Sequence, residues 1–331
     1  MVKFNTPVAL NESGTKISYH TQSMMIGSCF SENIGRNLQE CCIPITVNPF
    51  GILYNPSSIA NCLKHIITQK KFTDQDLFEK EGLFHSFSHH SSFSNSNPQT
   101  VLDQINNQSL EAYNRLKQAS HLFITFGTAW VFEFKKLGAV VSNCHKLPAL
   151  EFDHYRLSVN QIKAEWIEII DQLKAFNPNL HLVFTVSPIR HLKDGAHENQ
   201  LSKSTLLLAI DALISQLGNE LCSYFPAYEL QLDELRDYRF YANDLVHPSD
   251  LALEYIREKF IGYFLDKQSQ QLKETIEKLL QAAKHRPFNA SEKVYRDFIT
   301  LQLEKIKQLK MQFPHLELTW IEKLFQEKRG I

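Results

Sequence analysis

The chain is organised around residues 24–35, which read MMIGSCFSENIG. An apolar run ends at Gly27, and the pattern that follows has the spacing of one helical face, in Ile34, Leu38 and Cys41. A strand, a tight glycine turn and a helix N-terminus in succession are typical of a nucleophile elbow. Such an elbow exposes one reactive side chain at the end of a sheet.

This turn carries two candidate nucleophiles, Ser28 and Cys29. The dipole and the unpaired N–H groups of a helix N-terminus favour the anion of a thiol or hydroxyl, and later an oxyanion. We expect Ser28 or Ser31 to cap the helix, with Glu32 near the positive end of its dipole. A strand-to-helix turn with no chemical role is the alternative that this stretch alone leaves open.

The composition is that of an ordinary globular protein, with 331 residues, 43% hydrophobic and 21% charged. The net charge of −1 gives no electrostatic reason to expect nucleic acid or an anionic membrane surface as a partner. No segment approaches the roughly 18 apolar residues of a membrane span, and the N-terminus lacks the apolar core of a signal peptide. We therefore expect a cytoplasmic protein. The six cysteines show neither a CxxC pair nor zinc spacing, which predicts free thiols and no metal.

Buried strands alternate with amphipathic helices along the chain. Strands are expected at residues 24–27, 43–47, 121–127, 131–134 and 180–186, and helices at 59–66 (capped by Ser57 or Ser58), 101–118, 159–176 and 203–217. This alternation predicts a three-layer α/β/α sandwich with a mainly parallel sheet over residues 1–265. Residues 266–331 are expected to form a helical extension, with helices at 272–283, at 294–301 and after Pro314.

Several polar loops follow the predicted strands, at the edge where open α/β sheets bind ligands. Gly51 lacks a Cβ and can bring a backbone N–H close to a reacting oxygen, although a purely structural turn is the alternative. The loop 82–98 is rich in His, Ser and Phe. We interpret it as substrate-facing rather than metal-binding, despite its histidines His85, His89 and His90.

Two further loops offer polar and basic side chains. They contribute Asn143, His145 and Lys146 from SNCHKLP, and Arg190 and His191 from SPIRH. The basic members of this set either bind a polar or anionic substrate or form surface ion pairs.

A second informative motif, NDLVHPS, precedes the next predicted helix. Its spacing lets Asp244 accept a hydrogen bond from one ring nitrogen of His247, which leaves the other nitrogen free to act as a base. The pair alone is weak evidence of a site. Together with a nucleophile elbow near the start of an α/β chain, it predicts a catalytic triad.

These blocks carry a family resemblance. GSCFSENIG, NPFGILYNP, GTAWVF, NCHKLP, SPIRH and NDLVHPS resemble the GSCFA family, itself similar to the SGNH/GDSL hydrolases, over about residues 20–265. The resemblance places Gly27 on the first glycine of the Gly-Asp-Ser-Leu block, Ser28 on its aspartate and Cys29 on its nucleophilic serine. It also places the later Asp-x-x-His block on Asp244 and His247.

The oxyanion blocks match less well. Gly51 resembles the glycine of the second block, whose N–H helps to form the oxyanion hole. The third block, Gly-x-Asn-Asp, begins at Gly127, but Ala129 stands where the asparagine is expected. Thr128 and Asn143 are possible substitutes.

The prediction is an ester or thioester hydrolase that works through a covalent acyl-enzyme, without a cofactor or metal. Cys29 is the preferred nucleophile, because the register of Gly27 selects it and a thiol is already partly ionised near neutral pH. The rival, Ser28, requires the turn to shift by one residue. The resemblance implies a small-molecule or carbohydrate acyl ester as substrate. Two alternatives are an O-acyltransferase and a catalytically silent carbohydrate-binding or scaffold module, which the missing asparagine favours.

Overall fold

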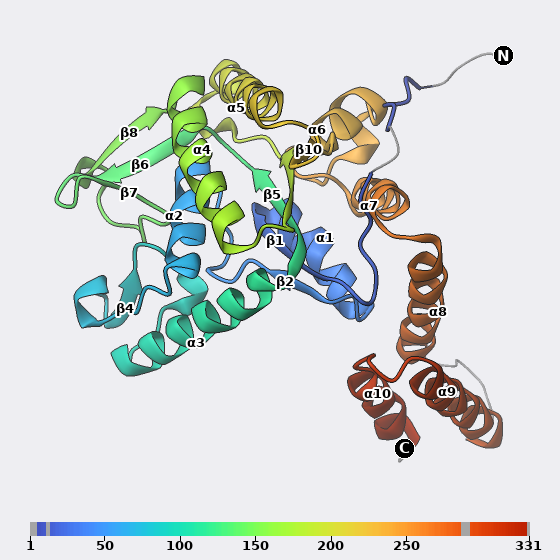
Figure 1. The fold of residues 1–331 in the computed structure, drawn as a ribbon. Helices are drawn as coiled ribbons and strands as arrows, with labels where there is room; N and C mark the ends of the chain where they lie inside the picture. The colour runs from blue at the N-terminus through green and yellow to red at the C-terminus, as the bar shows by residue number, and fades with distance from the viewer. Residues whose placement is uncertain (1–4, 11–13, 286–291, 330–331) are drawn as a thin grey trace.

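A five-stranded parallel sheet forms the centre of the computed structural model, which describes residues 5–10, 14–285 and 292–329 (Figure 1). Its strand order is β10-β9-β5-β1-β2, and all neighbours pair in parallel. The strands are β1 (Gln22–Gly27), β2 (Ile45–Val47), β5 (Ala119–Phe126), β9 (His181–Val186) and β10 (Cys222–Tyr224). The sheet grows in opposite directions from β1, so a topological switch point lies between β1 and β5.

Helices cover both faces of this sheet, which confirms the predicted three-layer α/β/α architecture. Met24 and Ile26 of β1 pack on one side with α2 (Pro56–Ile67), α3 (Pro98–Lys117), α4 (Val159–Phe176) and α5 (Ala196–Leu217). Met25 of β1 packs on the other side with α1 (Cys29–Glu40) and α7 (Asp250–Phe264). Alternate residues of a strand point to opposite faces, which is why one strand serves two cores.

Two glycines allow neighbouring elements to lie close together, since Gly27 lets β1 approach β5 and Gly35 lets α1 approach β2. Gly27 has a φ of +138°, and a Cβ added there would lie 2.2 Å from the carbonyl oxygen of Thr125. Gly35 faces β2, and a Cβ added there would lie 2.5 Å from Cγ2 of Val47. The contact between β1 and β5 and the packing of α1 on the sheet therefore each depend on a missing side chain.

The helix caps agree only partly with expectation. Ser28 caps α1, with its Oγ accepting the N–H of Phe30 at 3.3 Å. The prediction that Ser57 or Ser58 caps α2 is wrong, because Asn55 is the cap and Pro56 is the first helical residue. Asn55 Oδ1 accepts the N–H of Ser58 at 2.8 Å. Ser57 and Ser58 lie inside the helix, so neither can serve as its N-terminal cap.

Smaller elements surround the sheet. A hairpin of β3 (Leu77–Lys80) and β4 (Leu83–Ser86) was not predicted from the sequence. A three-stranded antiparallel sheet has β6 (Trp130–Phe134) between β7 (Ala139–Val141) and β8 (Phe152–Arg156), and only its β6 was predicted. Short helical turns occur at 74–76, 91–93, 149–151, 192–194 and 238–240, and α6 (Ala227–Glu229) leads into a π-helical turn at Leu230–Glu234.

The C-terminal helices, predicted from the sequence, are α8 (Lys267–Lys284), α9 (Glu292–Gln312) and α10 (Thr319–Arg329). In Figure 1 α8 continues from α7, and α9 and α10 lie side by side at its far end. Their apolar residues join the core that α1 and α7 form with the sheet. Tyr19 links the two regions, since its hydroxyl donates to the carbonyl of Cys41 at 2.8 Å and its N–H to Ser269 Oγ at 3.3 Å. None of the helices within the described ranges has the length and apolar character needed to cross a membrane.

Candidate active site

A cleft of about 540 Å³ lies at the carboxyl ends of β1, β5 and β9, beside the switch point. The predicted site residues that line it are Ser28, Cys29, Thr128, Asn143, Arg190, His191 and His247. Residues separated by more than 200 positions in the sequence thus meet in one cavity.

Cys29 is the first residue of α1, and its side chain is partly exposed to this cleft. Ser28 is only 1% exposed, and its Oγ is used as the helix cap. The thiol of Cys29 is thus more accessible from the cleft than the hydroxyl of Ser28. The N–H of Cys29 has no hydrogen-bond acceptor among the described residues, as expected for the first turn of a helix. Its Sγ lies 3.5 Å from the hydroxyl of Tyr54.

A small hydrogen-bond network holds this elbow in place. Asn48 Oδ1 accepts the N–H of Gly27 at 2.8 Å, and Asn48 Nδ2 donates to Glu32 Oε2 at 2.7 Å. The carbonyl of Tyr54 accepts the N–H groups of Gly127 and Thr128 at 2.7 and 3.0 Å. The loop between β2 and α2 therefore ties the ends of β1 and β5 together.

His247 and Asp244 form the expected pair. His247 Nδ1 lies 2.6 Å from Asp244 Oδ2, and Oδ1 of the same carboxylate accepts the backbone N–H groups of His247 and Val246 at 2.9 and 3.0 Å. These backbone hydrogen bonds, followed by that from the His247 ring, lower the pKa of Asp244 to about 2. The aspartate is therefore ionised near neutral pH, holds Nδ1 as the protonated nitrogen and leaves Nε2 available.

The structure places three predicted residues away from the cleft or in other contacts. The N–H of Gly51 donates to the carbonyl of Asn48 at 2.8 Å, so it is engaged in a turn. His145 is buried, and its Nε2 lies 2.9 Å from the carbonyl oxygen of Ser86. Lys146 is exposed and is absent from the cleft lining. Only His90 of the histidine-rich loop lines the cleft, whereas His89 is buried and stacks on Phe50 at 4.2 Å.

His191 occupies a central position beside the elbow. Its ring meets the Tyr54 ring edge-on, with centroids 5.6 Å apart, and its Nε2 is buried without a hydrogen-bond partner in the described part of the chain. Burial, with smaller contributions from the charges of Lys203 and His247, lowers the pKa of His191 to about 4. The imidazole is therefore neutral at physiological pH.

Lys203 of α5 lies beneath the cleft and is only 1% exposed. Its Nζ donates to the carbonyls of Gly127 at 2.6 Å and Ser187 at 2.7 Å, which follow β5 and β9. The Nζ also lies 5.7 Å from the ring centroid of Tyr228. Burial lowers the pKa of Lys203 to about 7.

The sequence analysis missed Tyr54 and an aromatic wall of the cleft. That wall consists of Trp130, Phe132 and His154. His154 stacks on Phe132 with ring centroids 4.2 Å apart and lies 4.7 Å from Trp130. The alternation along β6 could have predicted part of this wall, because Trp130 and Phe132 are two residues apart and share a face of the strand.

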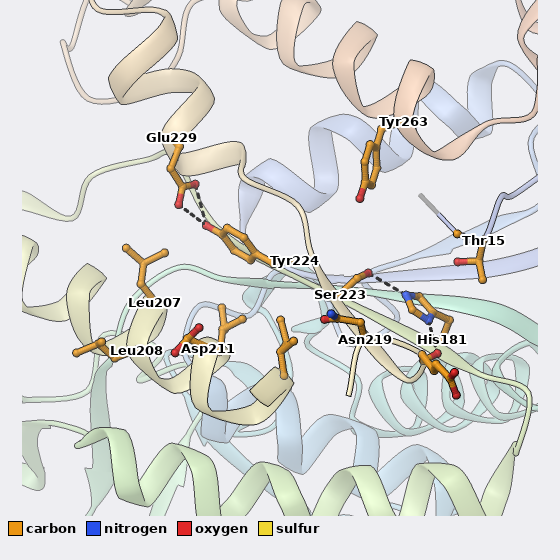
Figure 2. A pocket seen from close by; sticks show the side chains of 14 residues that line it. Thr15, His181, Leu207, Leu208, Asp211, Asn219, Ser223, Tyr224, Glu229 and Tyr263 are labelled. Carbon is orange, nitrogen blue, oxygen red and sulfur yellow. Dashed lines mark hydrogen bonds between the residues drawn. The ribbon is translucent and has the colours of Figure 1, made fainter. Parts of the chain in front are cut away.

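A second cavity, of about 1000 Å³, lies beside β10 and α5 (Figure 2). There Tyr224 donates to Glu229 at 2.8 Å, and His181 Nε2 lies 2.8 Å from Ser223 Oγ. None of the predicted site residues lines it, and its described lining contains no cysteine. The cleft at Cys29 is therefore the better candidate for covalent chemistry.

Comparison with known proteins gives the family. Residues 22–260, which include the elbow and the Asp244–His247 pair, match the GSCFA family. The chain belongs to the GSCFA family. Residues 276–328 of this GSCFA protein match the domain described as "GSCFA domain protein, C-terminal domain". No curated protein matches the chain significantly.

The solved structures that resemble this GSCFA protein distantly include two esterases. One is an acetyl xylan esterase from the rumen bacterium Butyrivibrio proteoclasticus, with 11% identity, a TM-score of 0.38 and coverage of 74% of this chain and 63% of that chain. The chain thus spans less than two thirds of that esterase. The other is a carbohydrate esterase family 3 protein from Talaromyces cellulolyticus, with 8% identity, a TM-score of 0.36 and coverage of 78% of this chain and 99% of that chain.

Proposed function

We propose that this protein is an acyl-transfer enzyme, an ester or thioester hydrolase with Cys29 as nucleophile, His247 as general base and Asp244 as its orienting carboxylate. One observation carries the proposal. A partly exposed thiol at a helix N-terminus shares a cleft with a histidine whose Nδ1 is held by a carboxylate at 2.6 Å. This arrangement supports the roles of nucleophile, base and orienting group that we propose.

The chemistry proceeds in two halves. His247 Nε2 takes the proton of the Cys29 thiol as Sγ forms a bond to the ester carbon, and the carbonyl π pair moves onto oxygen. The pair then returns, the bond to the alcohol oxygen breaks, and His247 gives its proton to that oxygen. A water molecule attacks the resulting thioester in the same way, which releases the carboxylic acid and restores the thiol. A sugar hydroxyl in place of water makes the same enzyme an acyltransferase.

The cleft favours a small acyl group carried on a sugar. A wall of Trp130, Phe132 and His154 offers flat apolar surface to a pyranose ring, and Arg190 and Lys193 offer hydrogen-bond donors to its hydroxyl groups. A volume of about 540 Å³ accommodates a mono- or disaccharide segment.

One observation favours a second candidate, a carbohydrate-binding module without activity. Ala129 stands where a catalytic asparagine is expected, and it is fully buried, with its N–H donating to Ser202 Oγ at 2.8 Å. An aromatic wall without an oxyanion hole binds sugar but does not transfer acyl groups.

Hydrolysis of p-nitrophenyl acetate distinguishes these functions. We expect Cys29→Ala and His247→Ala to abolish turnover, while Ser28→Ala retains most of it. Cys144→Ala is the matched control, because Cys144 is a second partly exposed thiol lining the same cleft. Loss of activity in Ser28→Ala but not in Cys29→Ala would transfer the role to Ser28. Equal background rates in all proteins, with sugar binding retained, would support the binding module.

A further inference from the structure

We propose that His191 is a catalytic residue that donates the Nε2–H hydrogen bond to the oxyanion, in place of the missing third-block asparagine. This inference rests on the proposed acyl-transfer function. It differs from the general substrate contact that the sequence predicts for His191, because it assigns the ring to the reacting oxygen and requires a specific hydrogen bond.

The position of the ring carries the argument. A Cβ added to Gly127 would lie 3.0 Å from the carbonyl oxygen of Tyr54, 3.4 Å from His191 Nε2 and 3.5 Å from Ser28 Cβ, so the ring nitrogen and the elbow lie close to the same glycine. The backbone N–H of His191 is anchored on α5, where it donates to Asn199 Oδ1 at 2.9 Å. Nε2 is a buried nitrogen without a partner in the described structure, and burying an unsatisfied polar atom costs about 1–3 kcal/mol. An acceptor supplied by the substrate removes this penalty.

The charge state of the ring suits a donor rather than a base. With its pKa lowered to about 4, His191 is a neutral imidazole whose Nε2–H tautomer donates one hydrogen bond. The nearby Lys203 and His247 disfavour its protonation further. A neutral imidazole stabilises a developing oxyanion without carrying a charge in the resting enzyme.

Two backbone donors and one side chain at the start of the third block are already engaged. The N–H groups of Gly127 and Thr128 both donate to the carbonyl of Tyr54. Thr128 Oγ1 accepts the N–H of Trp130 at 3.1 Å and lies 3.1 Å from Ser202 Oγ. We assign the oxyanion to His191, whose unpartnered Nε2 lies beside Gly127, and to the N–H of Cys29. As Sγ of Cys29 bonds to the carbonyl carbon, the displaced π pair on oxygen accepts both hydrogen bonds.

The test compares two reactions of the same thiol in a Cys144→Ala background. Acylation of Cys29 by p-nitrophenyl acetate passes through an oxyanion, whereas alkylation by iodoacetamide does not. We expect His191→Leu to slow acylation about 100-fold or more at unchanged KM, because removing one oxyanion donor typically costs 10²–10³ in kcat. Alkylation, located by mass spectrometry, should stay within about twofold of the reference, and His191→Gln should recover most of the acylation rate because its amide keeps an N–H donor.

Ser142→Ala is the control, since Ser142 is another polar residue that lines the cleft and we assign it no role in binding or in the reaction. Acylation of His191→Leu at the reference rate would overturn the inference and leave the triad standing. Parallel loss of acylation and alkylation, or no recovery in His191→Gln, would show a merely structural role and also overturn it. No acylation of Cys29 in the reference protein would refute the proposed function itself, and the inference with it.

Discussion

Replacing Lys203 with methionine tests how the floor of the cleft is built. Methionine keeps an unbranched side chain of similar length, so the apolar stem still fills its space. The substitution removes the ammonium group that donates to the carbonyls of Gly127 and Ser187. Each buried carbonyl left without its donor costs about 1–3 kcal/mol. The substitution also removes the free-energy cost of burying the ammonium group, and this gain opposes the loss.

The cost of burying Lys203 depends on pH, and the direction in which stability changes with pH follows from the pKa of this lysine. Burial lowers the pKa from 10.5 in the unfolded chain to about 7 in the folded protein. Between these values the unfolded chain binds a proton that the folded protein does not, so raising the pH stabilises the fold. The gain is at most about 1.4 kcal/mol per pH unit, or about 2 kcal/mol between pH 7 and pH 9. Below the folded pKa both states are protonated, and the dependence disappears.

Urea unfolding of the wild type and Lys203→Met, followed by circular dichroism under reducing conditions from pH 6 to pH 9, measures this effect. The stability difference in favour of the wild type should grow by about 2 kcal/mol from pH 7 to pH 9, because His191, whose pKa depends on Lys203, is already neutral in this range and the remaining titrations are shared. Lys64→Met is the control, since Lys64 is an exposed lysine of α2, and its difference from the wild type should be flat. A flat or falling difference for Lys203→Met would refute the account of a desolvated lysine.

Three further predictions concern packing, catalysis and specificity. Gly35→Ala should lower the free energy of unfolding by about 1–3 kcal/mol, because the added Cβ overlaps Val47. In a double-mutant cycle measured by urea unfolding, Val47→Ala should restore most of this loss. Simple additivity of the two changes would contradict this packing. Asp244→Asn should lower kcat about 10²–10⁴-fold with little change in KM for p-nitrophenyl acetate, because the wrong tautomer of His247 is then favoured; an unchanged kcat would remove Asp244 from the triad. Trp130→Ala should raise KM for an acetylated disaccharide about tenfold, because the sugar loses its stacking surface, and should leave KM for p-nitrophenyl acetate nearly unchanged. Equal effects on both substrates would argue against stacking of the sugar on this wall.

Strong local patterns made most of the central fold predictable. The apolar run before Gly27 and the helical spacing after it gave β1 and α1, and the periodicity of residues 159–176 gave α4 with its observed bounds. The short β10 and the polar β8 offered too little pattern to be recognised. Their strand structure comes from pairing with neighbouring strands, Cys222 with Leu182 for example, which is a tertiary contact.

The candidate site was predictable where one short motif carried the geometry, and less so where the fold supplied it. His145 follows Asn143 closely in sequence, but left-handed backbone at His145 and Lys146, with φ of +45° and +56°, directs the two side chains elsewhere. The burial of Lys203 could have been predicted, since this lysine lies in the apolar stripe of α5 with Leu206 and Ile210. A lysine within such a stripe indicates a buried partner.

The separation of Cys29 from His247 along the chain has a consequence for biosynthesis. The thiol and its helix lie at the start of the α/β region, and the histidine enters just before α7, after every strand of the central sheet. A nascent chain therefore exposes the cysteine long before the ribosome has added the base that activates it. Under the proposed mechanism, a chain that stops before residue 247 carries the nucleophile but has no partner to take its proton, so premature termination yields inactive fragments.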